Sequence, residues 1–414
     1  MIRLAEIEAA RERTAGELVR TPCVPSSTLS EELEAEIWLK CEGLQRTGSF
    51  KPRGALNRIL TLSPDQRDRG VVAASAGNHA QGVAYAAARV GIPALIVMPE
   101  ITPLVKISQT RRWGAEIELH GETLDEALER ARELRETDDL TFVHPFDDEE
   151  IIAGQGTVGL EIVEDVPGVD VVVSPIGGGG LISGISAAVE ALRPETRIYG
   201  VQTEAAPSMA ESLRSGSLTP VSGRRSIADG IAVKKPGEKT FPQIAKRVEE
   251  VVLVTEEEIE GAIFRLLEAE KLVAEGAGAA SYAAVRAGKI PDLSSRRVVI
   301  VLSGANIDLN ILGRLIERSL VRQFRLTRLR VTIQDRPGAL AEVLGIVAES
   351  GANVLRIHHE RHFSEATVWE TEVELTLEIR DQEHIEGLLR DLLEAGYDRI
   401  EEPDLRLLES PILP

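Results

Sequence analysis

Residues 169–181 read VDVVVSPIGGGGL, an apolar run that ends in four consecutive glycines. The run Val169–Ile176 predicts a buried strand, and the residues from Leu181 to about Leu192 predict a helix. A strand, a glycine turn and a helix start bring free backbone N–H groups and the positive end of a helix dipole to one point. The turn therefore predicts an anion site, most often a site for phosphate.

Other interpretations of the glycine turn fit less well. Ser183, and not a glycine, follows Gly180 by three residues, so the spacing does not match the dinucleotide fingerprint. A nucleoside triphosphate loop would end in Gly-Lys-Ser or Gly-Lys-Thr, which is missing from this segment. A plain turn would not need the conformational entropy that four glycines cost. We therefore favour a phosphate cup formed by Gly177, Gly178, Gly179, Gly180 and Leu181.

A lysine stands out in residues 49–55, which read SFKPRGA, because the whole chain has only nine lysines. Arginine stays protonated and cannot form an imine, whereas a desolvated lysine can. Lys51 is therefore a candidate nucleophile. The alternative is a surface lysine at a helix start, since Pro52 suits a first helical turn. These seven residues do not decide between the two.

Two further polar blocks follow strand-like runs. Residues 75–82 read SAGNHAQG, come after the predicted strand 70–74 and open a predicted helix. Residues 302–306 read LSGAN and come after the predicted strand 298–301. Helix capping alone would justify Ser75 or Asn78. Each block is a weak signal by itself.

Together, the blocks 49–55, 75–82, 177–181 and 303–306 resemble the fold-type II family of pyridoxal-phosphate (PLP) enzymes. Their order and spacing resemble the threonine dehydratases, or threonine ammonia-lyases, best. Segments 152–157, 228–233 and 274–279 agree, and the resemblance runs to about residue 320.

The resemblance implies a role for each matching position. Lys51 would hold PLP covalently and, once released, remove the Cα proton of the substrate. The glycine cup would bind the phosphate, Asn78 the ring hydroxyl and Ser303 the pyridine nitrogen. The backbone turn would bind the substrate carboxylate through Ser75, Gly77, Asn78 and His79, with Phe50 and Glu275 in supporting roles.

The implied reaction is the deamination of L-threonine to 2-oxobutanoate and ammonia, the first step toward isoleucine, with L-serine as a further substrate. An ammonia-lyase that prefers serine or another hydroxyamino acid remains an alternative. A second alternative is an amino-acid sensor with a decayed catalytic lobe. Retention of Lys51, the glycine cup, Asn78 and Ser303 together argues against decay. The sequence does not separate a biosynthetic from a catabolic role.

Two positions depart from relatives of this fold. Serine racemases carry a serine immediately before the Gly-Asn pair, and this chain has Ala76, which cannot transfer a proton. We therefore expect elimination without appreciable racemisation. Many relatives bind a divalent ion through a Glu and an Asp six residues later. Glu204 matches the first, but the later position is Ala210, so we expect no metal there.

Composition sets broad limits. The chain has 414 residues, of which 43% are hydrophobic, enough for two or three domains. A net charge of −20 argues against nucleic acid and anionic membranes as partners. No apolar run reaches the length of a membrane span, and residues 1–30 have no signal-peptide core. Two cysteines provide no disulfide framework, so we expect a cytoplasmic protein.

Strands and helices alternate from about residue 37 to 305, which predicts an α/β fold with parallel sheets and helices on both faces. We expect a two-lobed fold-type II catalytic domain over residues 1–320, with a small lobe at about 50–150. The segment 326–410 follows the order βαββαβ of a small ferredoxin-like domain, with a last strand near 398–407.

The turn DRPGAL at residues 335–340 and the segment ESGAN at 349–353 resemble ACT regulatory domains. The resemblance implies an amino-acid effector, isoleucine or valine, bound near Asp335, Gly338 and Asn353 at a seam between two copies. We therefore expect a homo-oligomer, either a dimer or a tetramer. A dimerisation module without a ligand is the alternative.

Overall fold

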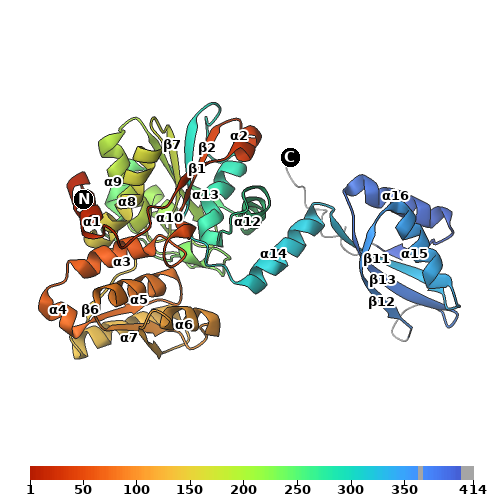
Figure 1. Cartoon of the computed structure of the whole chain (residues 1–414), viewed down its shortest axis with the longest axis horizontal. Coiled ribbons are helices and arrows are strands. Elements are labelled where there is room, and N and C mark those ends of the chain that lie inside the picture. The colour runs from red at the N-terminus through yellow and green to blue at the C-terminus, as the bar shows by residue number, and fades with distance from the viewer. Residues whose placement is uncertain (362–366, 402–414) are drawn as a thin grey trace. The chain divides into compact units, whose positions relative to one another are not determined.

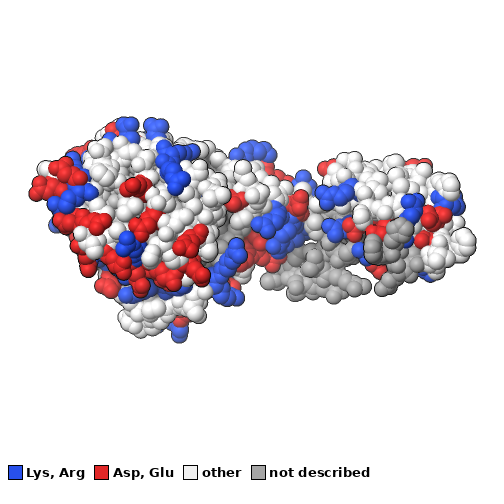
Figure 2. All heavy atoms as spheres, turned by 90° about the horizontal axis from the view of Figure 1, so that it is seen from below, with Lys and Arg blue, Asp and Glu red and all other residues white. Residues whose placement is uncertain are grey.

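The computed structural model describes residues 1–361 and 367–401 (Figure 1). The chain forms two compact units, of which the first comprises Met1–Ile307 and the second begins at Asp308. Among the described residues, no helix combines the length and the apolar character needed to cross a bilayer. Acidic side chains are prominent over the first unit on the face that Figure 2 shows, in keeping with the net charge.

The larger sheet of the first unit has six strands in the order β1-β2-β10-β7-β8-β9, and only β1 runs antiparallel to its neighbour. Its strands are β1 (Cys23–Pro25), β2 (Glu36–Cys41), β7 (Val171–Pro175), β8 (Arg197–Thr203), β9 (Glu250–Val254) and β10 (Arg297–Leu302). Val172 and Val299 pack with Ile185 of α9 (Gly180–Leu192), and their strand neighbours are buried as well. Both faces are therefore covered, as continuous valine-rich runs predict.

The smaller sheet is parallel throughout, in the order β5-β4-β3-β6. Its strands are β3 (Val71–Ala74), β4 (Ala94–Met98), β5 (Glu116–Leu119) and β6 (Thr141–Phe142). Val71 and Ile96 pack in one cluster with residues of α3 (Lys51–Leu60) and α5 (Asn78–Val90). The alternate residues Val72 and Val97 pack against α7 (Leu124–Thr137).

Other helices complete the first unit. They are α1 (Leu4–Arg13), α2 (Ser27–Leu33), α4 (Pro64–Arg69), α6 (Leu104–Arg111), α8 (Glu149–Asp165), α10 (Ser208–Ser215), α11 (Phe241–Arg247), α12 (Glu256–Glu270) and α13 (Gly276–Arg286), with the short 3₁₀ turns η1 (Glu42–Leu44) and η2 (Asp229–Ile231).

The second unit begins with α14 (Leu309–Arg322) and continues as a small α/β sandwich. Its antiparallel sheet has the order β12-β13-β11-β14, made of β11 (Leu326–Gln334), β12 (Asn353–Glu360), β13 (Glu370–Glu378) and β14 (Ile400–Glu401). Residues of α15 (Ala339–Ser350) and α16 (Gln382–Glu394) share one apolar core with the sheet.

The α/β fold with parallel sheets and the βαββαβ order of the C-terminal part are confirmed. The compact units divide at Ile307, and α14 belongs to the second. The domain limits 1–320 and 326–410 stay predictions. The end of the predicted last strand, beyond residue 401, lies outside the described residues.

Candidate active site

Three of the predicted site segments follow the carboxyl ends of parallel strands. Ser75 follows β3, Gly177 comes shortly after β7, and Ser303 follows β10. In open α/β sheets, ligands bind outside the carboxyl ends of the strands. This placement indicates one shared site in the first unit.

Lys51 is the first residue of α3, where Pro52 favours a helix start. Its Nζ donates a hydrogen bond of 2.9 Å to the carbonyl of Pro145. A Cβ built on Gly82 of α5 would lie 3.0 Å from the Cβ of Lys51, so this glycine lets the two helices approach. Burial lowers the pKa of Lys51 to about 8, against the opposing effect of the Glu275 charge. A sizeable fraction of the amine is therefore neutral near pH 7 to 8.

The glycine cup joins β7 to α9. Gly179 caps the helix with a φ of +99°, which favours glycine. Among the described residues, no acceptor contacts the backbone N–H groups of Gly177, Gly178 and Gly179. The hydroxyl of Thr240 donates to the carbonyl of Gly178 at 2.6 Å and fixes the turn. Free N–H groups at a helix N-terminus are what a phosphate requires.

Phe146 packs directly on the cup. A Cβ on Gly178 would lie 2.3 Å from the Phe146 ring, so only glycine fits there. His144 accepts hydrogen bonds at its Nδ1 from the backbone N–H of Phe146 and of Asp147, at 3.2 and 2.8 Å. Burial lowers the pKa of His144 to about 4, which keeps this nitrogen an acceptor. The segment around Pro145 thus connects Lys51 to the phosphate cup.

Asn78 lies at the centre of a chain of side-chain hydrogen bonds. Its Oδ1 accepts a bond of 2.7 Å from Asn306, and its Nδ2 donates a bond of 2.6 Å to Glu275. Asn306 also donates to the carbonyl of Thr47 at 2.7 Å. Burial, and then the negative charge of Asp229, raises the pKa of Glu275 to about 7. The side chain of Asn78 is therefore held from both sides.

Ser303 is attached to the segment that carries Lys51. Its carbonyl accepts a bond of 3.1 Å from the N–H of Phe50, and Ser49 forms an antiparallel bridge with Gly304. The Ser303 side chain is 3% exposed, and its only hydrogen bond among the described residues is a long one of 3.4 Å to the carbonyl of Ala277. Its hydroxyl is thus available to a ring nitrogen.

The turn at residues 75–79 leads into α5. The Oγ of Ser75 accepts a bond of 3.2 Å from the N–H of Gly77. The ring of His79 bonds to the carbonyl of Val143 at 2.9 Å through Nε2. Burial, and then the positive charge of Lys51, lowers the pKa of His79 to about 3. The imidazole is therefore neutral, and its Nε2 is engaged by the carbonyl of Val143.

The residues fit PLP. A buried lysine amine, a glycine turn with free N–H groups and a buried serine hydroxyl match the aldehyde, the phosphate and the ring nitrogen of this cofactor. Sequence reasoning did not single out Pro145, Phe146, Thr240 and Asn306. Asn306 lies in the block at residues 302–306, which was a usable signal, whereas nothing local marks the other three.

Glu204 and Ala210 stay outside this site. Glu204 lines a surface cavity of about 140 Å³ with Arg224, Arg225 and Glu256. Two guanidinium groups at its wall do not suit a cation site. Within residues 1–361 and 367–401, no three metal-ligating side chains come together. The expectation of no metal stays a prediction.

The predicted effector residues of the second unit do not lie together, because Asp335 and Asn353 are at opposite ends of the sheet. Asp335 directly follows β11, and Gly338 caps α15 with a φ of +93°. Asn353 pairs with Glu378, which pairs with Leu326 at the opposite end of β11. Eight residue steps of a strand span about 27 Å. One copy of this unit therefore does not bring Asn353 to Asp335.

Comparison with known proteins agrees with this geometry. Residues 15–304 match the family described as pyridoxal-phosphate dependent enzyme, and residues 327–395 match the ACT domain. An L-threonine ammonia-lyase from Thermotoga maritima is 52% identical over 398 residues, which cover 96% of this chain and 99% of that protein.

Solved structures of similar fold include a threonine deaminase from Solanum lycopersicum, with a TM-score of 0.72 and 38% identity over 76% of this chain and 86% of that chain. Maize serine racemase has a TM-score of 0.73 and 33% identity over 77% of this chain and 98% of that chain. The resemblance read from the sequence is thereby confirmed. The chain belongs to the family of pyridoxal-phosphate-dependent enzymes, together with the threonine ammonia-lyases, and carries an ACT domain in its C-terminal part.

Proposed function

We propose that this enzyme converts L-threonine to 2-oxobutanoate and ammonia, and that it also accepts L-serine. The observation that carries the proposal is the buried amine of Lys51, whose pKa is about 8, next to a glycine cup with free N–H groups. The relative from Thermotoga maritima, which covers nearly the whole chain, is named an L-threonine ammonia-lyase.

PLP, when bound, supplies an electron-withdrawing ring that acidifies the Cα–H bond of an attached amino acid. Lys51 supplies the base, because its desolvated amine accepts a proton near neutral pH. The glycine cup, against which Phe146 packs, would hold the phosphate group of PLP. Ser303 contributes a neutral hydroxyl at the buried end of β10.

The substrate carboxylate fits the turn before α5. Backbone N–H groups at a helix N-terminus stabilise an anion, and the neutral ring of His79 adds no competing charge. Gly77 leaves open space, since no atom lies within 4 Å of a Cβ placed on it. The turn is therefore built to bind a carboxylate through the backbone.

The test is release of ammonia and 2-oxoacid from L-threonine and L-serine, measured with the wild type and Lys51→Ala. Lys51→Ala should lose at least about 10⁴-fold in rate, since both the nucleophile and the base are removed. Lys246→Ala, at an exposed lysine paired with Glu190, is the control and should keep the rate. A wild type with kcat/KM higher for serine than for threonine would favour the serine-preferring alternative. A wild type that binds amino acids without turnover would favour the sensor.

For the second unit, we propose regulation by isoleucine or valine. The ACT domain supports an amino-acid effector. The separation of Asp335 and Gly338 from Asn353 supports a site completed by a second copy, and hence a homo-oligomer. A cytoplasmic location remains part of the proposal and is compatible with the two free cysteines, Cys23 and Cys41.

A further inference from the structure

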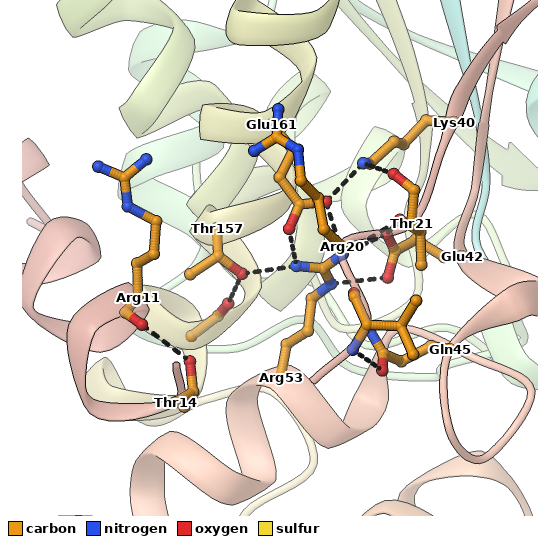
Figure 3. A network of polar contacts seen from close by, with 12 residues as sticks. Arg11, Thr14, Arg20, Thr21, Lys40, Glu42, Gln45, Arg53, Thr157 and Glu161 are labelled. Carbon is orange, nitrogen blue, oxygen red and sulfur yellow. Dashed lines mark hydrogen bonds and ion pairs between the residues drawn. The ribbon is translucent and has the colours of Figure 1, made fainter. Parts of the chain in front are cut away.

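Four buried charged side chains gather around Arg53, two residues after Lys51 in the sequence, without belonging to the site described above (Figure 3). Lys40 and Glu42 are 0% exposed, Arg53 is 1% exposed and Glu161 is 7% exposed. Three of them come from the neighbouring elements β2, η1 and α3, and Glu161 comes from α8, 108 residues beyond Arg53 in the chain. We call these four residues the ionic clamp.

Arg53 is the centre of the clamp. Its guanidinium bonds to both oxygens of Glu42, each at 2.8 Å, and to both oxygens of Glu161 at 2.7 and 2.8 Å. The hydroxyls of Thr157 and Thr21 accept further bonds at 3.1 Å. This use of a planar fork on two carboxylates is specific to arginine, because a lysine ammonium offers a single point of attachment.

The charges of the clamp balance. Lys40 donates to Glu161 at 2.5 Å and to the carbonyl of Thr21 at 2.6 Å, so two cations face two carboxylates. Burial by itself would raise the pKa of Glu161, but the bonds and charges of Arg53 and Lys40 hold it below its usual value. Arg53 and Lys40 thus favour the charged form of Glu161 despite its burial.

The clamp closes the loop that carries Lys51. Glu42 directly follows β2, and Arg53 lies in the first turn of α3, so their paired bonds tie two points eleven residues apart. Between these points, Ser49 bridges Gly304 and the N–H of Phe50 bonds to the carbonyl of Ser303. The loop is thus fixed at both ends and along its side.

We propose that Arg53 is a positioning residue that sets where the Lys51 amine lies relative to Ser303, without touching substrate or cofactor. The proposal rests on the role of Lys51 and not on the identity of the substrate. Replacing buried ion pairs by apolar residues is often neutral for stability, so stability alone does not account for a clamp of this kind. The need to hold the Lys51 amine in place accounts for it, because misplacing a reacting group by about 1 Å can cost roughly 10²-fold in rate.

The experiment compares Arg53→Lys with Arg58→Lys in the full-length holoenzyme. Arg58 lies on the same helix, and its Nε is 3.1 Å from Asp148, the N-cap of α8, but it is outside the clamp. We measure the absorbance spectrum of bound PLP against pH, kcat and KM separately, and the thermal midpoint. Arg53→Lys should shift the pH midpoint of the spectrum and lower kcat by at least about tenfold, with KM changed much less. Arg58→Lys should leave the pH midpoint of the spectrum unchanged and should keep kcat within about twofold of the wild-type value.

The proposal is overturned if Arg53→Lys keeps the wild-type spectrum and kcat. It is also overturned if both variants lose activity only in proportion to folded protein. Should Arg53→Lys fail to fold, Glu42→Gln decides by the same measurements, since it keeps the shape and removes one charge. The spectrum is measured without substrate, so the two proposals can fail separately. If the wild type is inactive on threonine and serine but Arg53→Lys still shifts the spectrum, the proposed function is rejected and the positioning role of Arg53 is supported.

Discussion

The amide of Asn78 donates a hydrogen bond of 2.6 Å to a carboxyl oxygen of Glu275, which is 8% exposed. The contact joins the first residue of α5 to the N-cap residue of α13 through a titratable group. Burial raises the pKa of Glu275 to about 7. This carboxyl therefore changes charge within the range where the enzyme is expected to work.

A first prediction concerns stability. Because the folded-state pKa of Glu275 is raised, this carboxyl binds more protons in the folded protein than in the unfolded chain between about pH 4.5 and 7. The contribution of Glu275 to the free energy of unfolding should therefore fall as pH rises through this window. Glu275→Gln should lack this fall. The free energy of unfolding of the variant, relative to that of the wild type, should therefore be higher at pH 8 than at pH 5 by on the order of 3 kcal/mol. Urea unfolding of the cofactor-free proteins measures it, with the exposed Glu249→Gln as control. Parallel curves for wild type and Glu275→Gln would contradict it.

A second prediction concerns the amine of Lys51. The rate at which the cofactor-free enzyme captures added PLP should rise about tenfold per pH unit below pH 8 and level off above it, since burial lowers this pKa to about 8. Stopped-flow absorbance follows the capture. A rate that still rises toward pH 10 would show that the amine is not desolvated. Lys51→Ala should show no capture.

A third prediction concerns the contact between Gly178 and Phe146. The methyl group of Gly178→Ala would lie 2.3 Å from the ring and must displace it. Overpacking of this kind costs about 1 to 3 kcal/mol, so affinity for PLP should fall by about fivefold to 150-fold if the cost falls on the bound state. Fluorescence titration of the cofactor-free protein measures the affinity. Gly313→Ala, where a methyl group meets open space, should leave it unchanged. Phe146→Ala in the Gly178→Ala background should restore part of the loss.

A fourth prediction concerns stereochemistry. Ala76 places a methyl group where serine racemases carry a hydroxyl, so Lys51 is the one base expected at the Cα proton. Incubation with L-serine should give elimination and no D-serine by chiral chromatography. Ala76→Ser should gain measurable D-serine. D-serine formed by the wild type at a rate near that of elimination would reject a single base.

A fifth prediction concerns regulation. In calorimetry on the full-length Lys51→Ala variant, which cannot turn over substrate, isoleucine or valine should bind. Adding Asp335→Ala should weaken this binding by at least about tenfold, the loss of one charged hydrogen-bond partner. Asp391→Ala, on the exposed side of α16, is the matched control. Failure of both amino acids to bind would leave the dimerisation module as the better interpretation.

The sequence predicted the strand-turn-helix units well, because their signals are local. The glycine turn, the lysine at the start of α3 and the αβ alternation each lie within a short window. Hydrogen-bond partners that are distant in the sequence have no such local pattern. Arg53 was read only as part of a motif, and its partner Glu161 is 108 residues away. Pro145 is 94 residues from Lys51, and a proline carbonyl as acceptor has no sequence pattern.

The same reason limited the interpretation of Asn78 and His79. Their positions in the turn were predictable from the motif, but their side-chain partners were not. Asn306 lies 228 residues from Asn78, and the ring of His79 reaches a carbonyl of the next segment along the sheet. Packing between distant segments decides which polar atoms of such a residue bond to the protein and which are left for a ligand.

The proposed attachment points for the cofactor lie in α3, at the start of α5, and directly after β7 and β10, so they span residues 51 to 303. A nascent or partly unfolded chain that lacks β10 has the lysine and the glycine turn but lacks Ser303. Such a chain offers only a fraction of the contacts. PLP should therefore stabilise almost only the completely folded first unit, and the absorbance of the bound cofactor should report complete folding.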